Sequence, residues 1–133
     1  MLKKVFCIDD DPITLMLCKK VMQRVEFAEN IDTLQNGEEA ITFFDNHQNS
    51  NQEKENIPEL IFIDLNMPIM NGWEFLDIYH KKEYHKKFKT HFIILSSTID
   101  PKDVQKSKSY PMVIDFLSKP ITKIMLEELK GKY

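Results

Sequence analysis

The chain has 133 residues, of which 42% are hydrophobic and 29% charged, and its formal net charge is −3 at pH 7. These values predict one soluble globular domain over residues 1–133, with no general attraction to nucleic acid. Cys7 and Cys18 fall in apolar patterns and are expected to be small core residues, because they offer neither a disulfide framework nor a metal-binding spacing. The first apolar run stops after four residues, and no run is long enough for a membrane span. We therefore expect a cytoplasmic protein without membrane insertion.

The first part of the chain alternates strands and helices. A short apolar strand is expected over 5–8, and Asp11-Pro12 begins a helix, because Asp suits the N-cap and Pro the first helical position. A weaker strand over 30–34 and a helix over 38–45 follow. In the first helix, one apolar series recurs every four residues and predicts the buried face: Ile13, Leu17, Val21 and Val25.

Residues 47–56 form a polar stretch. This composition predicts a solvated loop, and the loop is long for a connection within a compact domain. A tolerated surface insertion is the favoured interpretation of this stretch, and a binding loop is the alternative.

The central strand is Leu60-Ile61-Phe62-Ile63, an apolar run that leads into one carboxylate, Asp64. Alternate side chains of a strand point to opposite faces, and both pairs are apolar here, so the strand is expected to be buried on both faces. Open parallel sheets bind their ligands at the carboxyl ends of the strands, which is the position of Asp64. The alternative for this residue is a turn or capping role.

The second half continues the alternation to five strands and five helices. The remaining expected elements are a helix over 72–80, a strand over 92–95, a helix over 101–108, a strand over 113–117 and a helix after Pro120. This order predicts a parallel sheet covered by helices on both faces. The basic stretch 79–88 predicts a solvated helix end, and contact with an anionic partner is the alternative.

Reactive side chains follow the ends of four of the strands. They are Asp9, Asp10 and Asp11 after the first strand, Asp64 after the third, Ser96 after the fourth and Lys119 after the fifth. The carboxyl ends of parallel strands share one edge, so these groups are expected to face one crevice. Neighbouring carboxylates repel each other, and a hard cation such as Mg²⁺ relieves the repulsion. For single residues, capping, turn and loop roles are the alternatives, and for Asp11 an N-cap is favoured.

This set of groups predicts phosphoryl chemistry. An Asp beside Mg²⁺ can attack phosphorus and become an aspartyl phosphate. The charge of the phosphoryl group would be neutralised by the metal and by Lys119, and Ser96 would donate a hydrogen bond.

Four sequence segments together resemble the receiver domains of two-component response regulators, the CheY-like family. The segments are Cys7-Ile8-Asp9-Asp10-Asp11-Pro12, Asp64-Leu65-Asn66-Met67-Pro68-Ile69-Met70-Asn71-Gly72, Leu95-Ser96-Ser97 and Asp115-Phe116-Leu117-Ser118-Lys119-Pro120. The resemblance covers essentially the whole chain. It implies an α/β fold of three layers, a flavodoxin-like (βα)₅ arrangement. The implied sheet has five parallel strands in the order 2-1-3-4-5, with helices on both faces.

The resemblance also implies the roles of the acidic residues. Asp64 is the implied phosphoacceptor, and Mg²⁺ is the implied cofactor. The implied metal ligands are Asp10, Asp64 and the backbone carbonyl of Asn66, with Asp9 acting through water.

Three further residues have implied roles. Ser96 would contact the phosphoryl oxygens, and Lys119 would pair with them. The Lys119–Pro120 bond is implied to be cis. Ser96 and Phe116 form the implied switch, and because Phe has no hydroxyl, a rotamer switch here would depend on packing alone. Ser109-Tyr110-Pro111 departs from the family's small-residue pattern before the last strand.

The implied function is two-component phosphorelay signal transduction. A histidine kinase or a histidine phosphotransfer protein would phosphorylate Asp64. The phosphorylated domain would then dock on an unknown downstream protein or pass its phosphoryl group on. We expect a stand-alone receiver, or one cut from a longer protein, that is a monomer or weak dimer and does not bind nucleic acid directly. We expect no enzyme activity beyond self-phosphorylation and intrinsic autophosphatase activity.

Two other functions are compatible with parts of the sequence. Asp9-x-Asp11 offers the D-x-D pair of a Mg²⁺-dependent phosphatase of the haloacid dehalogenase type, which also forms an aspartyl phosphate. Against this, Ile13 stands where that motif has Thr or Val, and no later G-D-x-x-x-D pair is present. The other alternative is a receiver-like binding module that is never phosphorylated, which the complete acidic set with Ser96 and Lys119 disfavours.

Overall fold

The computed structural model describes residues 1–48 and 56–132. In these ranges, five strands form one sheet in the order β2-β1-β3-β4-β5, and every neighbouring pair is parallel. This confirms the predicted fold class. The strands are β1 (Leu2–Ile8), β2 (Ala28–Leu34), β3 (Leu60–Asp64), β4 (His91–Ser96) and β5 (Val113–Ser118). Residues 49–55, most of the stretch expected to be a surface loop, lie outside the described residues.

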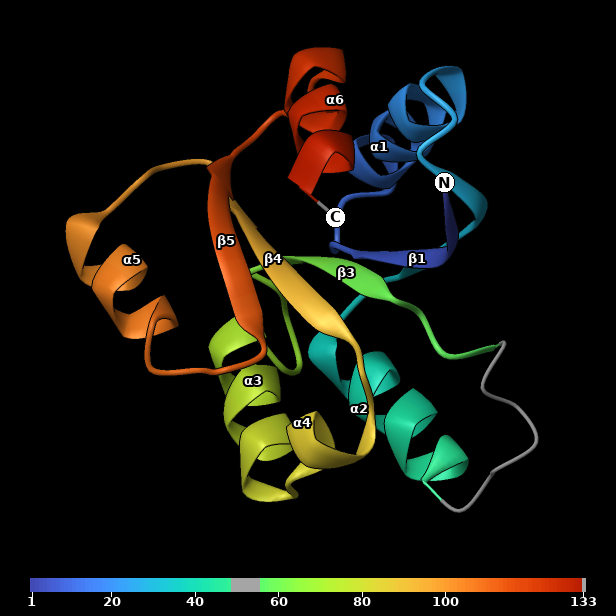
Figure 1. Ribbon diagram of the computed structural model, residues 1–133. Helices are drawn as coiled ribbons and strands as arrows, with labels where there is room; N and C mark the ends of the chain where they lie inside the picture. The colour runs from blue at the N-terminus through green and yellow to red at the C-terminus, as the bar shows by residue number, and fades with distance from the viewer. Residues whose placement is uncertain (49–55, 133) are drawn as a thin grey trace.

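Helices cover both faces of the sheet. They are α1 (Pro12–Arg24), α2 (Gly37–His47), α3 (Gly72–Lys81), α4 (Tyr84–Lys87), α5 (Pro101–Ser107) and α6 (Lys123–Lys132). Figure 1 shows α1 and α6 on one side of the sheet, with α2, α3 and α4 on the other, and α5 beside the edge strand β5. All five residues of β3 are buried, as expected for a strand that lies between two helical layers.

The two sides of the sheet have different cores. The side of α2 and α3 is rich in aromatic rings, and Phe44 lies at its centre, 5.0 Å from the rings of both Tyr79 and Phe88. The side of α1 and α6 is built mainly from aliphatic and sulfur-containing side chains, with only Phe27 and Phe62 as aromatic members among its buried described residues. It includes both cysteines, which are buried and free. The prediction that Cys7 and Cys18 are small core residues is confirmed.

The buried face of α1 differs from the predicted one. Ile13 and Leu17 are 63% and 52% exposed, whereas the residues that face the sheet follow a 3-4-3 spacing: Leu15, Cys18, Met22 and Val25. The helix carries two apolar stripes. In its first two turns, the stripe that the i+4 series predicted to be buried is the exposed one. Asp11 caps this helix directly after the carboxyl end of β1, so its first turn lies beside the edge of the sheet.

The basic stretch after α3 forms a separate short helix, α4, so residues 1–48 and 56–132 contain one more helix than was predicted. Glu83 has a left-handed φ of 59°, and this conformation changes the direction of the chain between α3 and α4. The Tyr84 side chain turns inward, and its hydroxyl donates to Asp45 at 2.5 Å. The stretch is therefore anchored in the core by an aromatic side chain, while its lysines face solvent as predicted, together with His80 and Glu83.

Candidate functional site

The carboxyl ends of β1, β3 and β4 meet at one edge of the sheet. Ile8 pairs with Ile63, and Asp64 pairs with Leu95, so Asp9, Asp64 and Ser96 follow in register on neighbouring strands. All three are buried, at 5%, 6% and 3% exposure. Buried polar side chains are costly unless they are paired, so three at one strand edge indicate a site.

Three carboxylates gather at this edge. Asp9, Asp10 and Asp64 each offer one oxygen, and these oxygens lie within 4.8 Å of one another. Asp10 is the exposed member of the cluster. Asp11 is turned away as the N-cap of α1, where it accepts from the Ile13 N–H and the Thr14 hydroxyl, both at 3.0 Å. Its predicted capping role is confirmed.

Lys119 brings the balancing positive charge. Its Nζ lies 2.5 Å from Asp9 Oδ2 and 3.2 Å from Asp64 Oδ2. The Lys119 N–H donates to the Ser96 carbonyl at 2.8 Å, which fixes the start of the loop after β5. The peptide bond that follows, Lys119–Pro120, is cis as the resemblance implied.

The ion pairs and burial shift two pKa values in this pocket. Burial, followed by the charge of Asp9, raises the pKa of the Asp64 carboxyl above its ordinary value, although Lys119 acts in the opposite direction. Burial alone would lower the pKa of Lys119, but the hydrogen bond to Asp9 and the charge of Asp64 outweigh it and raise this pKa. The pocket therefore holds more negative charge than Lys119 alone relieves.

The loop after Asp64 is tightly folded. Gly72 is required there, because a Cβ at this position would lie 2.5 Å from the Asp64 carbonyl oxygen. Ile69 has a φ of 69°, and the Met70 N–H donates to the Pro68 carbonyl at 2.7 Å. A β-branched residue in the left-handed region is strained, and such strain persists where the surrounding structure imposes it.

The loop also begins α3. Asn71 and Glu74 form a reciprocal capping box at the start of this helix. The N-M-P-x-M-N-G run therefore has a structural explanation in addition to its implied functional one.

The two residues of the implied switch lie on neighbouring strands. The Ser96 hydroxyl accepts from the Thr98 N–H at 3.3 Å, a long hydrogen bond that another partner can replace. Phe116 is half-buried and packs against the aromatic side of the core. The Phe116 side chain is therefore neither fully exposed nor fully inserted into the core.

Sequence reasoning missed Tyr110 as a structural anchor. Its ring is 6% exposed and stacks on Trp73 with a centroid separation of 5.9 Å, and its hydroxyl donates to Asp77 on α3. The Ser109-Tyr110-Pro111 departure therefore joins the loop before β5 to α3. Its signal in the sequence was a lone aromatic in a polar segment, which does not specify a partner.

A hollow of about 240 Å³ lies beside the pocket. It is lined by Thr14, Leu17, Cys18, Ser97, Lys119, Pro120 and Ile121. Leu17 belongs to α1 and is exposed, and the same helix carries two further exposed apolar side chains, Ile13 and Met16. Exposed apolar side chains grouped beside a polar pocket are typical of a protein-binding surface.

The donor set of the pocket fits Mg²⁺. This ion prefers hard oxygen ligands, commonly one or two carboxylates, and keeps several waters. The three clustered carboxylates supply such oxygens, and the exposure of Asp10 leaves room for water on one side. The raised pKa of Asp64 indicates that a further positive charge would be favourable here.

A five-stranded (βα)₅ sheet with acidic residues, a hydroxyl and a lysine at its carboxyl edge defines the CheY-like class of α/β domains. The sequence model of the response regulator receiver domain matches residues 5–129, and the chain belongs to this family. Receiver domains of two-component systems bind Mg²⁺ at an acidic pocket and are phosphorylated by histidine kinases.

Similar proteins include regulators and kinases. The chain is 32% identical to the transcriptional regulatory protein HptR of Staphylococcus aureus over 99% of its length, and 27% identical to hybrid signal transduction histidine kinase L of Dictyostelium discoideum over 100%. It spans 46% and 7% of these two relatives. A two-component response regulator from Cytophaga hutchinsonii has a TM-score of 0.85 and 31% identity, covering 98% of this chain and 96% of that one. Within the described residues, no helix is long and apolar enough to cross a membrane.

Proposed function

We propose that this chain is a cytoplasmic signalling receiver that accepts a phosphoryl group on Asp64 in a Mg²⁺-dependent reaction. The observation that carries the proposal is the meeting of three carboxylates within 4.8 Å, with Lys119 ion-paired to two of them, in a member of the receiver family. The family match leaves the phosphatase of the haloacid dehalogenase type without support.

In the proposed reaction, one oxygen of Asp64 attacks the phosphorus of a phosphohistidine donor. The bond between phosphorus and the histidine nitrogen breaks, and its electron pair leaves on the imidazole. Lys119 exchanges one of its two carboxylate partners for a phosphoryl oxygen, which it can reach from between Asp9 and Asp64. The Ser96 hydroxyl gives up its contact with Thr98 and donates to another phosphoryl oxygen.

The metal would be held by the acidic cluster. Asp10, Asp64 and the carbonyl of Asn66 are its proposed ligands, and Asp9 acts through a water. Mg²⁺, when bound, neutralises the carboxylates and the incoming phosphoryl oxygens. Asp10→Ala should therefore abolish the rise in melting temperature that Mg²⁺ gives the wild type, and an unchanged rise would contradict the ligand assignment.

The phosphoryl donor would be a histidine kinase or a histidine phosphotransfer protein that docks on α1. The exposed side chains of Ile13, Met16 and Leu17 offer it an apolar surface directly beside the pocket. About half or more of each side chain is exposed to solvent in the isolated domain, and a binding role would explain this exposure.

Output would begin at Ser96 and Phe116. Drawing Ser96 toward a phosphoryl oxygen lets the half-buried Phe116 move further inward. Full burial of a Phe is worth about 1.5–3 kcal/mol, less than the roughly 5.5 kcal/mol that reverses a 1:99 population, and part of this ring is already buried. A downstream partner therefore completes the switch. Hydrogen exchange with and without beryllofluoride should show altered protection in residues 97–118, and changes limited to the pocket would contradict this route.

The proposed role includes no separate enzyme activity, because the domain hydrolyses at most its own acyl phosphate. The direct test is incubation with phosphoramidate, with and without Mg²⁺, followed by intact mass spectrometry. One added phosphoryl group is expected with Mg²⁺ and none without it. No addition under either condition would favour a receiver-like binding module that is never phosphorylated.

A further inference from the structure

The amino end of the sheet carries a group of lysines that the proposed phosphorylation does not use. Lys86 and Lys87 are exposed at the end of α4, and Lys89 is exposed on the segment that joins α4 to β4. Lys86 pairs with Glu83 at 3.1 Å, and Lys87 and Lys89 have no carboxylate partner among the residues that the structure describes. This segment is strongly basic in a chain whose net charge is −3.

The lysines border two hollows that share one aromatic side chain, Phe88. The first hollow, of about 240 Å³, is lined by Ile57, Pro58, Glu59, Lys87, Phe88 and Lys89. The second, of about 340 Å³, is lined by His85, Lys86, Phe88, Lys89, Thr90, His91, Pro111 and Met112. Phe88 is 9% exposed, so it forms an apolar wall and does not project.

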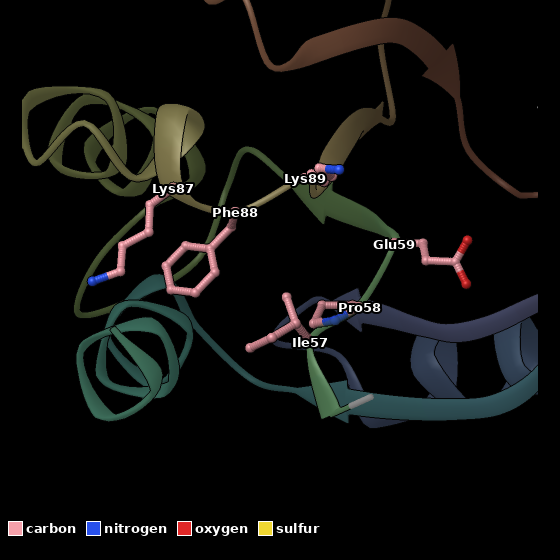
Figure 2. Close-up of a pocket in the computed structure, with 6 residues that line it drawn as sticks. All are labelled: Ile57, Pro58, Glu59, Lys87, Phe88 and Lys89. Carbon is pink, nitrogen blue, oxygen red and sulfur yellow. The ribbon is translucent and has the colours of Figure 1, made fainter. Parts of the chain in front are cut away.

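The first hollow combines an apolar interior with a cationic rim. Figure 2 shows the Phe88 ring directed toward Ile57, with Pro58 beside them and the Glu59 carboxylate directed away. That carboxylate is already engaged, because its Oε1 accepts the Lys3 N–H at 2.8 Å. Since Lys87 and Lys89 also have no ion pair with a carboxylate of the described residues, their charges are available to an external anion.

We propose that this surface, formed by Lys86, Lys87, Phe88 and Lys89 with the two hollows, binds an acidic segment of a partner protein. One apolar side chain of the segment would enter a hollow against Phe88, and carboxylates on either side of it would pair with the lysines. The positive charge of the lysines favours an acidic partner, and the recessed apolar walls favour a partner that inserts one apolar side chain.

The shape of the surface argues against two other anionic partners. Membrane-surface segments insert projecting aromatic or aliphatic side chains into the lipid, whereas Tyr84 and Phe88 are both buried here. Single-stranded nucleic acid stacks its bases mainly on exposed Phe, Tyr or Trp rings, and the described residues that line this surface include no exposed ring of these three types.

The surface lies at the opposite end of the sheet strands from Asp64, so its occupancy and phosphorylation can be measured separately. The probe is a fluorescent acidic peptide with one central leucine, compared with the same peptide carrying serine in its place. The test variant is K87E/K89E. The matched control is K102E/K108E, which makes the same charge change at exposed lysines of α5 and its C-cap.

Fluorescence polarisation should show saturable binding to the wild type that weakens with salt. K87E/K89E should bind about tenfold more weakly, because two attractions become repulsions, whereas K102E/K108E stays within about twofold. The serine peptide should also bind more weakly than the leucine peptide, and phosphorylation by phosphoramidate should be unchanged in K87E/K89E.

Three outcomes would overturn the proposal. One is equal binding by the wild type and K87E/K89E, and another is no saturable binding of the leucine peptide. The third is tighter binding to phosphatidylserine vesicles or to a single-stranded oligonucleotide than to the peptide, because this would assign the surface to another class of partner.

Discussion

The aromatic core around Phe44 and the acidic pocket around Asp64 adjoin the same sheet but are built on opposite principles. In the core, aromatic rings pack against one another, as Phe44 and Tyr79 do edge to face at 5.0 Å, and such ring contacts favour the folded state. In the pocket, buried carboxylates repel each other and share one lysine. We infer from this comparison that packing in the core stabilises the fold and so offsets the repulsion between the pocket carboxylates.

The largest effect is expected from the core. Phe44→Ala should lower the free energy of unfolding by about 3–5 kcal/mol, because it removes a fully buried ring from a packed cluster. Urea denaturation measures this loss. Phe43→Ala is the matched control, since that neighbouring ring is only half-buried and should cost clearly less. Equal costs at the two positions would contradict the central place of Phe44.

The next effect concerns Lys119, the cation that pairs with two carboxylates of the pocket. Lys119→Met should lower stability at neutral pH by up to about 3 kcal/mol, because it leaves Asp9 and Asp64 buried without a partner. Added Mg²⁺ should recover part of the loss. Lys123→Met, at an exposed lysine 4.0 Å from Glu127, should change stability by less than about 0.5 kcal/mol. A loss that Mg²⁺ does not reduce would contradict the electrostatic explanation.

Lys119 also predicts a pH dependence in the wild type. Its pKa is raised in the folded state, so its stabilisation is fully present below the ordinary value of 10.5 and is lost as the pH rises through and above it. Lys119→Met should lack this alkaline loss of stability, which thermal melting across the alkaline range can measure.

The pocket should gain stability when one of its carboxylates is removed. Asp64→Asn should raise the free energy of unfolding by about 1 kcal/mol without Mg²⁺, since ionised Asp64 is disfavoured by burial and by Asp9. Because the pKa of Asp64 is raised in the folded state, ionisation of this carboxyl lowers the free energy of unfolding, and its removal should increase it. The gain is fully present above the folded pKa and vanishes as the pH falls below 3.8, where the carboxyl is protonated in both states. A destabilised Asp64→Asn at neutral pH would contradict the comparison.

The smallest effect is expected in the loop beside the pocket. Ile69→Asn should stabilise the domain by about 0.5–1 kcal/mol, because Asn tolerates a φ of 69° better than a β-branched residue does. Ile69 is 73% exposed, so little packing is lost. Thermal melting of this variant beside Ile99→Asn, an exposed isoleucine outside the left-handed region, separates backbone strain from surface polarity.

The fold and the pocket were predictable because their signals are local. Apolar runs such as Leu60 to Ile63 specify buried strands, and the parallel topology then brings the strand ends together. The juxtaposition of Asp9, Asp64 and Lys119 followed from this topology.

The parts that sequence reasoning missed depend on tertiary packing. Two apolar stripes compete on α1, and only the position of the helix over the sheet decides that Leu15 is buried and Ile13 exposed. Tyr84 and Tyr110 are aromatic residues in polar surroundings, and their partners, Asp45 and Asp77, lie more than 30 positions away. Neither periodicity nor propensity identifies such contacts.

The central claim is that Asp64 is the phosphoacceptor, and the most direct test is localisation of the phosphoryl group. After phosphorylation with Mg²⁺, borohydride reduces an aspartyl phosphate to homoserine, which peptide mass spectrometry assigns to one position. Conversion is expected at Asp64 and at no other residue, and Asp64→Asn should show none. Conversion at Asp9 or Asp10, or any conversion that persists in Asp64→Asn, would contradict the claim.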